Sequence, residues 1–167
     1  MNKEIGIIGL GKMVKGIASQ LAEKGWMVHA YNRTVEKAQE LANEFESITA
    51  YDSVEAMVAP ISSAPKLIWV MVPAGAAVDE TLFGEHGVSN YLKEGDIVID
   101  AGNSQYKNDA SRAAKLKEKG IQFVDAGVSG GPAGARNGAC IMVGGSKELF
   151  DTYEDLYKDL SIKGGYG

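Results

Sequence analysis

The chain has 167 residues, of which 45% are hydrophobic and 23% are charged, as in ordinary soluble globular proteins. Its formal net charge is −5 and its basic residues form no cluster, which argues against a nucleic-acid partner. The single cysteine, Cys140, excludes an internal disulfide and fits a reducing compartment. No apolar run approaches the roughly 20 residues of a membrane span, and the first residues lack a signal-peptide pattern. We therefore expect one cytoplasmic domain that contacts neither a membrane nor a nucleic acid.

A strand, a glycine turn and a helix are predicted at the start of the chain. Apolar residues 4–8 predict the strand, and residues 12–24 predict the helix. Gly9 allows a sharp turn, and Gly11 has no Cβ, so the backbone can approach a phosphate at the positive end of the helix dipole. A second strand at residues 28–31 completes the context for dinucleotide binding. The alternative is a glycine turn without a ligand.

The third glycine of the G-x-G-x-x-G pattern is replaced by Val14, with Gly16 two residues later. That third position governs close packing of the helix on the strand. Val14 is therefore expected to push the helix outward.

Strands and helices alternate along the rest of the chain. Further strands are predicted at residues 48–50, 67–72, 96–100, 121–124 and 139–143, and helices at residues 107–119 and 147–157 and after Thr34 and Ser53. The run 67–72 is apolar throughout, as in a strand covered on both faces. The predicted fold class is α/β, a Rossmann-type doubly wound, mostly parallel sheet flanked by helices over residues 1–167. The glycine-rich end, residues 163–167, suggests the first domain of a longer protein.

The residues after the second strand address the choice of cofactor. NAD sites usually place an acidic residue there, to bond the ribose 2′-hydroxyl. Asn32 is neutral instead, and Arg33 can offer a bidentate fork to a 2′-phosphate and a flat face to adenine. Thr34 adds a hydroxyl at a helix start. This pattern favours NADP over NAD; the alternative is that Arg33 is a solvated surface charge.

Small and polar residues also follow the later strands, where ligands of such sheets bind. Asn103 and Ser104 are either a turn and helix cap or contacts to nicotinamide or substrate. Residues 129–131, Ser-Gly-Gly, are either an anion-binding nest or a tight turn. Cys140 is expected to be an inert, buried core residue. His29 and His86 have no neighbours that indicate a metal site or a catalytic pair, so no metal site is predicted.

Several segments occur in the order typical of one family. They are Gly9-Leu10-Gly11-x-Met13, Asn32-Arg33-Thr34, the segment 70–75 (Val-Met-Val-Pro-Ala-Gly), the segment 100–104 (Asp-Ala-Gly-Asn-Ser), the segment 127–138 and the segment 142–145. The chain resembles the cofactor domain of decarboxylating 6-phosphogluconate dehydrogenase, and looks closest to the shorter, bacterial and archaeal form. Val14, Ala101 and the pair Pro132 and Ala133 depart from the usual pattern.

The resemblance implies a role for each matching residue. The pyrophosphate of NADP would meet Gly9, Leu10, Gly11, Lys12 and Met13, and the 2′-phosphate would meet Asn32, Arg33 and Thr34. The middle of the cofactor would lie along Val72, Pro73 and Ala74. Asn103 would touch both nicotinamide and substrate, and the sugar acid would contact Ser129, Gly130 and Gly131.

The implied reaction is NADP-dependent oxidative decarboxylation of 6-phosphogluconate to ribulose 5-phosphate and CO₂. The general base and acid of the family are expected after Gly167, in an all-helical second domain that also provides most of a homodimer or larger assembly. No catalytic residue is therefore expected in this chain, which should bind the cofactor without turnover. The alternatives are another β-hydroxyacid dehydrogenase, of the 3-hydroxyisobutyrate or glyoxylate/succinic semialdehyde reductase type, and a stand-alone NADP(H)-binding module.

Overall fold

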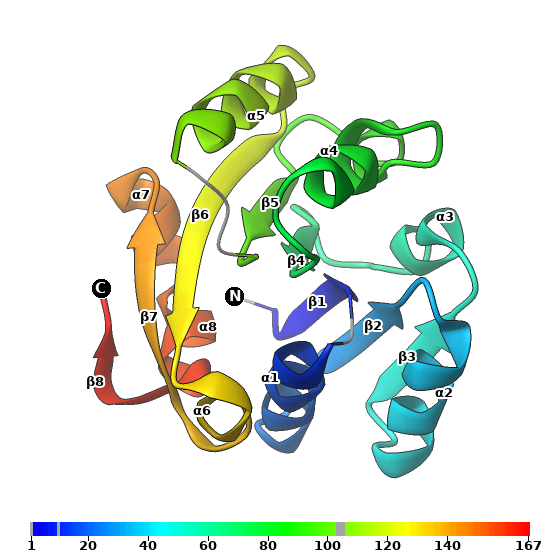
Figure 1. The fold of residues 1–167 in the computed structure, drawn as a ribbon, viewed down its shortest axis with the longest axis vertical. Helices are drawn as coiled ribbons and strands as arrows, with labels where there is room; N and C mark the ends of the chain where they lie inside the picture. Colours follow the sequence, from blue (N-terminus) through cyan, green and yellow to red (C-terminus); the bar gives the residue numbers. More distant parts are fainter. Residues whose placement is uncertain (1, 10, 103–105) are drawn as a thin grey trace.

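The computed structural model describes residues 2–9, 11–102 and 106–167. Within these residues the fold is an eight-stranded sheet flanked by helices (Figure 1). The strands are β1 Glu4–Ile8, β2 Met27–Tyr31, β3 Ile48–Tyr51, β4 Leu67–Val70, β5 Ile97–Asp100, β6 Gln122–Ser129, β7 Ala139–Gly144 and β8 Ser161–Tyr166. The helices are α1 Lys12–Glu23, α2 Val35–Glu44, α3 Val54–Val58, α4 Ala76–Phe83, the 3₁₀ turn η1 Val88–Asn90, α5 Tyr106–Glu118, α6 Gly131–Asn137, α7 Lys147–Thr152 and α8 Glu154–Leu160.

The sheet has the order β3-β2-β1-β4-β5-β6-β7-β8. Neighbouring strands from β3 to β6 pair in parallel, β6 and β7 pair antiparallel, and β7 and β8 pair in parallel. The order reverses between β1 and β4, as in a doubly wound sheet. The predicted Rossmann-type fold is confirmed.

Two hydrophobic clusters hold the helices to the two faces of the sheet. One cluster joins the sheet to α1, α2, α6, α7 and α8, and the other joins it to α3, α4, η1 and α5 (Figure 1). Strand β4 serves both, because Trp69 packs in the first cluster and Ile68 in the second. The apolar run that begins at Leu67 is therefore covered on both faces, as predicted. No helix in the described part of the chain is long and apolar enough to cross a membrane.

Helices α4 and α6 and the turn η1 are not among the predicted elements, and further differences lie in the last third of the chain. The strand predicted at residues 121–124 is wrong in length, because β6 continues to Ser129. Val124, Ala126 and Val128 are buried along it, and the continuation pairs with β7. The helix predicted at residues 147–157 is interrupted at Tyr153, and the glycine-rich end forms part of β8.

The prediction that Cys140 is buried is wrong, because its side chain is exposed. Along β7, Ala139 and Ile141 are buried while Cys140 and Met142 are exposed. Met142 is 79% exposed. Successive side chains of a strand point to opposite faces, and here only one face is covered.

Close packing of α1 depends on Gly16. Val14 is 2% exposed and belongs to the core of the α1 face. A Cβ on Gly16 would come within 2.8 Å of the backbone nitrogen of Arg136 in α6. The glycine that permits a close approach in α1 therefore faces another helix.

Candidate functional site

The glycine turn after β1 requires glycine at its first position. Gly9 has a φ of +97°, which favours glycine, and a Cβ there would overlap the carbonyl oxygen of Met71. The N–H of Gly9 donates to the carbonyl of Tyr31, at 3.0 Å. The turn is thus wedged between the carboxyl ends of β2 and β4.

The N-terminus of α1 is open to an anion. Gly11 is the N-cap and has no side chain to cap the first N–H groups, and the first turn contains no acidic residue. Among the described residues other than its immediate neighbours, no heavy atom lies within 4 Å of the place where a Cβ of Gly11 would stand. Unpartnered N–H groups at the positive end of a helix dipole favour phosphate.

A cavity of about 220 Å³ lies beside this helix end, between α1 and α2. Its lining residues are Gly11, Lys12, Lys15, Lys37, Glu40 and Leu41. Lys15 is 3.8 Å from Glu44, whereas Lys37 has no carboxylate partner in the part of the chain that is described. Lys37 follows Thr34 by three residues, at the position where a capping box would have Glu or Gln. A lysine at this position is the feature of the sequence that could have identified Lys37 as a site residue.

The segment after β2 presents Arg33 to solvent. The amide of Asn32 donates to the carbonyl of Thr34 at 3.0 Å, and Thr34 is the N-cap of α2. Arg112 and Arg136 pair with Asp79 and Glu23, but no ion pair to Arg33 occurs among the described residues. An exposed, unpaired guanidinium is suited to a phosphate.

The ends of β4 and β5 touch each other through backbone. A Cβ on Gly102 would come within 2.6 Å of the carbonyl oxygen of Val72. Val72 is half-buried, whereas Pro73 and Ala74 are exposed. Leu10, Asn103 and Ser104 lie outside the described residues.

Strand β6 extends beyond the carboxyl end of its neighbour β5, so the turn that follows β6 is displaced from the other turns. In the strand register, Asp125 of β6 lies opposite Asp100, the last residue of β5. Ser129 is four residues further along β6, so it lies about 13 Å beyond the end of β5. Ser129 is exposed, and its hydroxyl donates to the carbonyl of Cys140 at 3.4 Å. Gly130 and Gly131 have φ of +117° and +64° where α6 begins. Since α6 packs on α1 through Gly16, this turn lies on the α1 side of the sheet.

Three aspartates, Asp100, Asp109 and Asp125, form an acidic group near the carboxyl end of β5. Burial, together with the charges of Asp125 and Asp100, raises the pKa of Asp109 to about 6. Burial and the charge of Asp100 also raise the pKa of Asp125. Arg112 is 2% exposed and faces this group. The spacing of these residues in the sequence does not mark them as neighbours.

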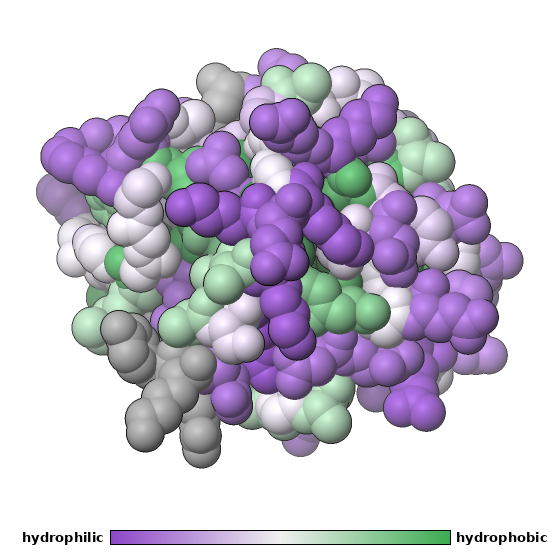
Figure 2. Space-filling model, turned by 90° about the horizontal axis from the view of Figure 1, so that it is seen from above, coloured by the Kyte–Doolittle hydropathy of each residue, from purple (hydrophilic) through white to green (hydrophobic). Residues whose placement is uncertain are grey.

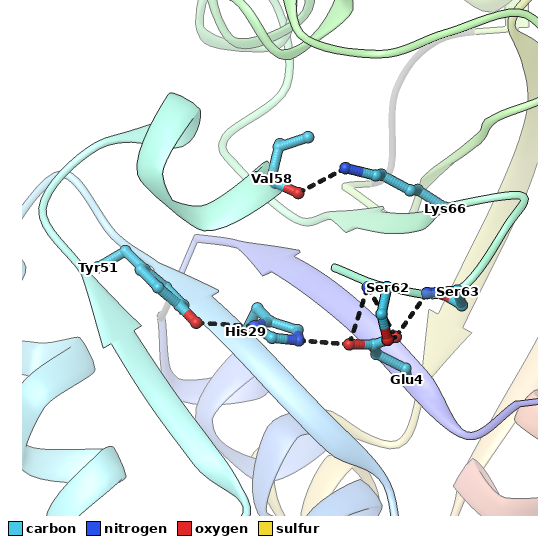
Figure 3. Close-up of polar contacts among 7 residues, drawn as sticks. All are labelled: Glu4, His29, Tyr51, Val58, Ser62, Ser63 and Lys66. Atoms are coloured by element: carbon cyan, nitrogen blue, oxygen red, sulfur yellow. Dashed lines mark hydrogen bonds and ion pairs between the residues drawn. The ribbon is translucent and has the colours of Figure 1, made fainter. Parts of the chain in front are cut away.

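A second polar cluster occupies the opposite, amino edge of the sheet (Figure 3). His29 donates from Nε2 to Glu4 at 2.8 Å, and its Nδ1 is 2.8 Å from the Tyr51 hydroxyl. Glu4 also accepts from the backbone N–H groups of Ser62 and Ser63. Burial raises the pKa of Glu4, but these hydrogen bonds outweigh it and lower the pKa to about 2. The sequence predicts no role for His29; the structure places it in this cluster, away from the glycine turn.

Comparisons with known proteins agree with this architecture. A family model described as the NAD binding domain of 6-phosphogluconate dehydrogenase matches residues 4–165. YqeC of Bacillus subtilis is 41% identical over 164 residues, which cover 98% of this chain and 52% of that protein. The decarboxylating 6-phosphogluconate dehydrogenase of Chlamydia pneumoniae is 35% identical over 98% of this chain and 34% of its own length.

A solved structure of 6-phosphogluconate dehydrogenase from Plasmodium falciparum superposes with a TM-score of 0.85 at 33% identity. The match covers 95% of this chain and 34% of that one, which was studied in its apo form, with NADP⁺ and with 6-phosphogluconate. This chain therefore spans about half or less of the relatives it matches. It belongs to the family of NAD-binding domains of 6-phosphogluconate dehydrogenase.

Proposed function

We propose that this chain is the NADP-binding domain of an enzyme that oxidises and decarboxylates 6-phosphogluconate. The observation that carries the choice of NADP is Arg33, an exposed arginine without an ion-pair partner among the described residues, at the end of β2. A carboxylate at that point would repel a 2′-phosphate, and Asn32 avoids this. Lys37, which lines the neighbouring cavity, adds a second cation without a carboxylate partner in the described part of the chain.

The proposed binding mode follows the carboxyl edge of the sheet. The pyrophosphate would lie on the first N–H groups of α1, where the space beside Gly11 is open. The 2′-phosphate would lie against Arg33 and Thr34. The cofactor would then cross the switch point between β1 and β4 and pass along Val72.

In the proposed reaction the C3 hydroxyl of the sugar acid would lose its proton as a hydride leaves C3, and NADP⁺ would supply the hydride acceptor. The resulting ketone lies β to the carboxylate, so it accepts the electron pair released when the C1–C2 bond breaks and CO₂ leaves. Protonation of the former C2, which becomes C1 of the product, then gives ribulose 5-phosphate. Residues 129–131 are proposed to contact the sugar acid, and the general base and acid are proposed to lie in the part of the relatives that this chain does not match.

The cofactor proposal is tested by titrating the chain with NADPH and NADH and following nicotinamide fluorescence. Because NADH lacks the 2′-phosphate that the guanidinium fork of Arg33 would bind, Arg33→Ala should weaken NADPH binding by roughly tenfold or more and weaken NADH binding far less. Lys147→Ala is the matched control, since it removes one positive charge from the exposed surface of α7. Equal loss of both ligands in Arg33→Ala, or tighter binding of NADH by the wild type, would contradict the proposal.

The reaction is tested on the longest natural chain that carries these 167 residues. We expect NADPH and CO₂ to form from 6-phosphogluconate and not from 3-hydroxyisobutyrate. The 167-residue chain alone should form no NADPH. Turnover by the short chain, or a preference for 3-hydroxyisobutyrate, would contradict this assignment.

A further inference from the structure

Arg112 joins the start of α4 to α5 at the carboxyl edge of the sheet. It lies on α5 and is 2% exposed. The face of the molecule that Figure 2 shows is largely hydrophilic. Its Nε and Nη2 donate to the two carboxylate oxygens of Asp79, at 2.9 and 3.2 Å. Nη2 also donates to the carbonyl of Gly75 at 3.3 Å. Gly75 is the N-cap of α4 and Asp79 lies in its first turn, so the guanidinium holds the start of α4.

The same side chain continues toward the loop after β5. Nη1 of Arg112 donates to Asp109 at 3.3 Å. Burial and the nearby charges of Asp125 and Asp100 raise the pKa of Asp109. Asp100 in turn accepts from the N–H of Gly102 at 3.0 Å. Arg112 therefore contacts both α4 and α5, and its partner Asp109 lies near Asp100 at the end of β5.

The segment between β4 and α4 is consequently held at three points. The glycine turn at Gly9 packs on the carbonyl of Met71, and Gly102 packs on the carbonyl of Val72. Arg112 holds the far end, at Gly75. Each hold depends on backbone atoms, so the path of this segment is fixed independently of its own side chains.

Stability alone does not account for an arginine at this place. Removing a guanidinium from water is costly, and replacing a buried ion pair by apolar residues of similar volume is often neutral or stabilising. The planar guanidinium of Arg112, with its acceptors at the start of α4 and on α5, instead fixes the orientation of these two helices relative to each other. The elements in question flank the half of the sheet beyond the switch point, over which the nicotinamide half of a dinucleotide lies when its adenine half is beside β2.

We propose that Arg112 is a positioning residue that fixes the loop after β4 against the nicotinamide half of the bound cofactor. This proposal rests on the proposed function, that NADP(H) binds at this edge. Arg112 itself would not touch the cofactor, and it acts through the backbone of Gly75 and the first turn of α4.

The test compares two ligands that share the adenosine 2′-phosphate end. NADPH carries the nicotinamide half, and adenosine 2′,5′-bisphosphate lacks it. Arg112→Met should weaken NADPH binding by roughly tenfold and leave the dissociation constant of adenosine 2′,5′-bisphosphate within about twofold of the wild type. Arg112→Lys keeps the charge but not the fork, so NADPH binding should recover only in part.

Asp79→Asn is the variant to use if Arg112→Met does not fold, because Asp79 is half-exposed and its loss breaks the same fork. It should shift the two ligands in the same unequal way. Glu4→Gln is the control for lost stability, since it disrupts the cluster at the opposite edge and should spare both affinities.

Equal weakening of both ligands, or no weakening of either, in the Arg112 and Asp79 variants would overturn the positioning role. A wild-type chain that binds neither ligand would contradict the proposed function itself. The two failures are therefore distinguishable.

Discussion

Two buried carboxylates at opposite edges of the sheet have pKa values shifted in opposite directions. At the amino edge, Glu4 is buried, but hydrogen bonds from His29, Ser63 and Ser62 lower its pKa to about 2. At the carboxyl edge, burial and neighbouring carboxylates raise the pKa of Asp109 to about 6. The first site supplies donors to its carboxylate, whereas the second brings like charges together.

The opposite pKa shifts mean that the Glu4 cluster stabilises the folded state near neutral pH, whereas the acidic group around Asp109 destabilises it. Near neutral pH the Glu4 cluster is satisfied, and the Asp109 group lowers the free energy of unfolding. Crowded acidic groups with raised pKa values are typical of functional sites, although ion-pair networks produce them too. Here the costly group lies behind the loops proposed to hold the cofactor, and the satisfied one lies away from them.

The largest effect on stability is expected from Glu4→Gln. The neutral amide would place an NH₂ group against donors that now point at a carboxylate, so we expect a loss of about 3 kcal/mol in the free energy of unfolding. Urea unfolding at pH 7 measures it. Glu23→Gln is the control, because Glu23 is half-exposed and its pairing with Arg136 should contribute less than about 1 kcal/mol.

The contribution of Glu4 should also depend on pH in a defined direction. Its folded pKa is below the ordinary value of 4.5, so the stabilisation is present above pH 4.5 and is lost as the pH falls toward 2. The difference in unfolding free energy between the wild type and Glu4→Gln should shrink over that interval. A difference that stays constant would show that Glu4 is not preferentially ionised in the folded chain.

A smaller effect is expected from Gly9→Ala at the carboxyl edge. Both Gly9 and Gly25 have positive φ, but only Gly9 would place a Cβ on another backbone, at Met71. We expect Gly9→Ala to cost about 2 kcal/mol more than Gly25→Ala in the free energy of unfolding. Equal losses in thermal or urea unfolding would mean that the turn is not wedged against β4.

The smallest effect is expected from Asp109→Asn, and it has the opposite sign. Because the folded pKa of Asp109 is above 3.8, its contribution is present below pH 3.8 and is lost as the pH rises through about 6. Asp109→Asn should therefore gain about 1 kcal/mol relative to the wild type between pH 4 and pH 8. If Asp109→Asn instead has a lower free energy of unfolding than the wild type at pH 8, the account in which neighbouring carboxylates destabilise ionised Asp109 is contradicted.

Local sequence signals predict the elements from β1 to β4 well. Strand β1 has the predicted bounds, and Thr34 and Ser53 are N-caps, as expected. Gly25 has the positive φ of a residue just after a helix. These features depend on neighbours within a few residues, so the sequence carries them directly.

The missed features depend on residues that are distant in the chain. His29 meets Glu4 and Tyr51, which lie 25 and 22 residues away, and no spacing rule joins them. Arg112 meets Asp79 at a separation of 33 residues. The length of β6 was visible in the alternation of Val124, Ala126 and Val128, but its glycine and aspartate residues resemble those of a loop.

The most direct test of the account is hydrogen exchange of the backbone amides with and without saturating NADPH. The carboxyl edge should be protected, with slower exchange at residues 11–14, 33–37 and 72–76. Residues 62 and 63, whose amides bond Glu4 at the amino edge, should exchange at unchanged rates. Protection at the amino edge, or none at residues 11–14 while NADPH is bound, would contradict the assignment of the cofactor site.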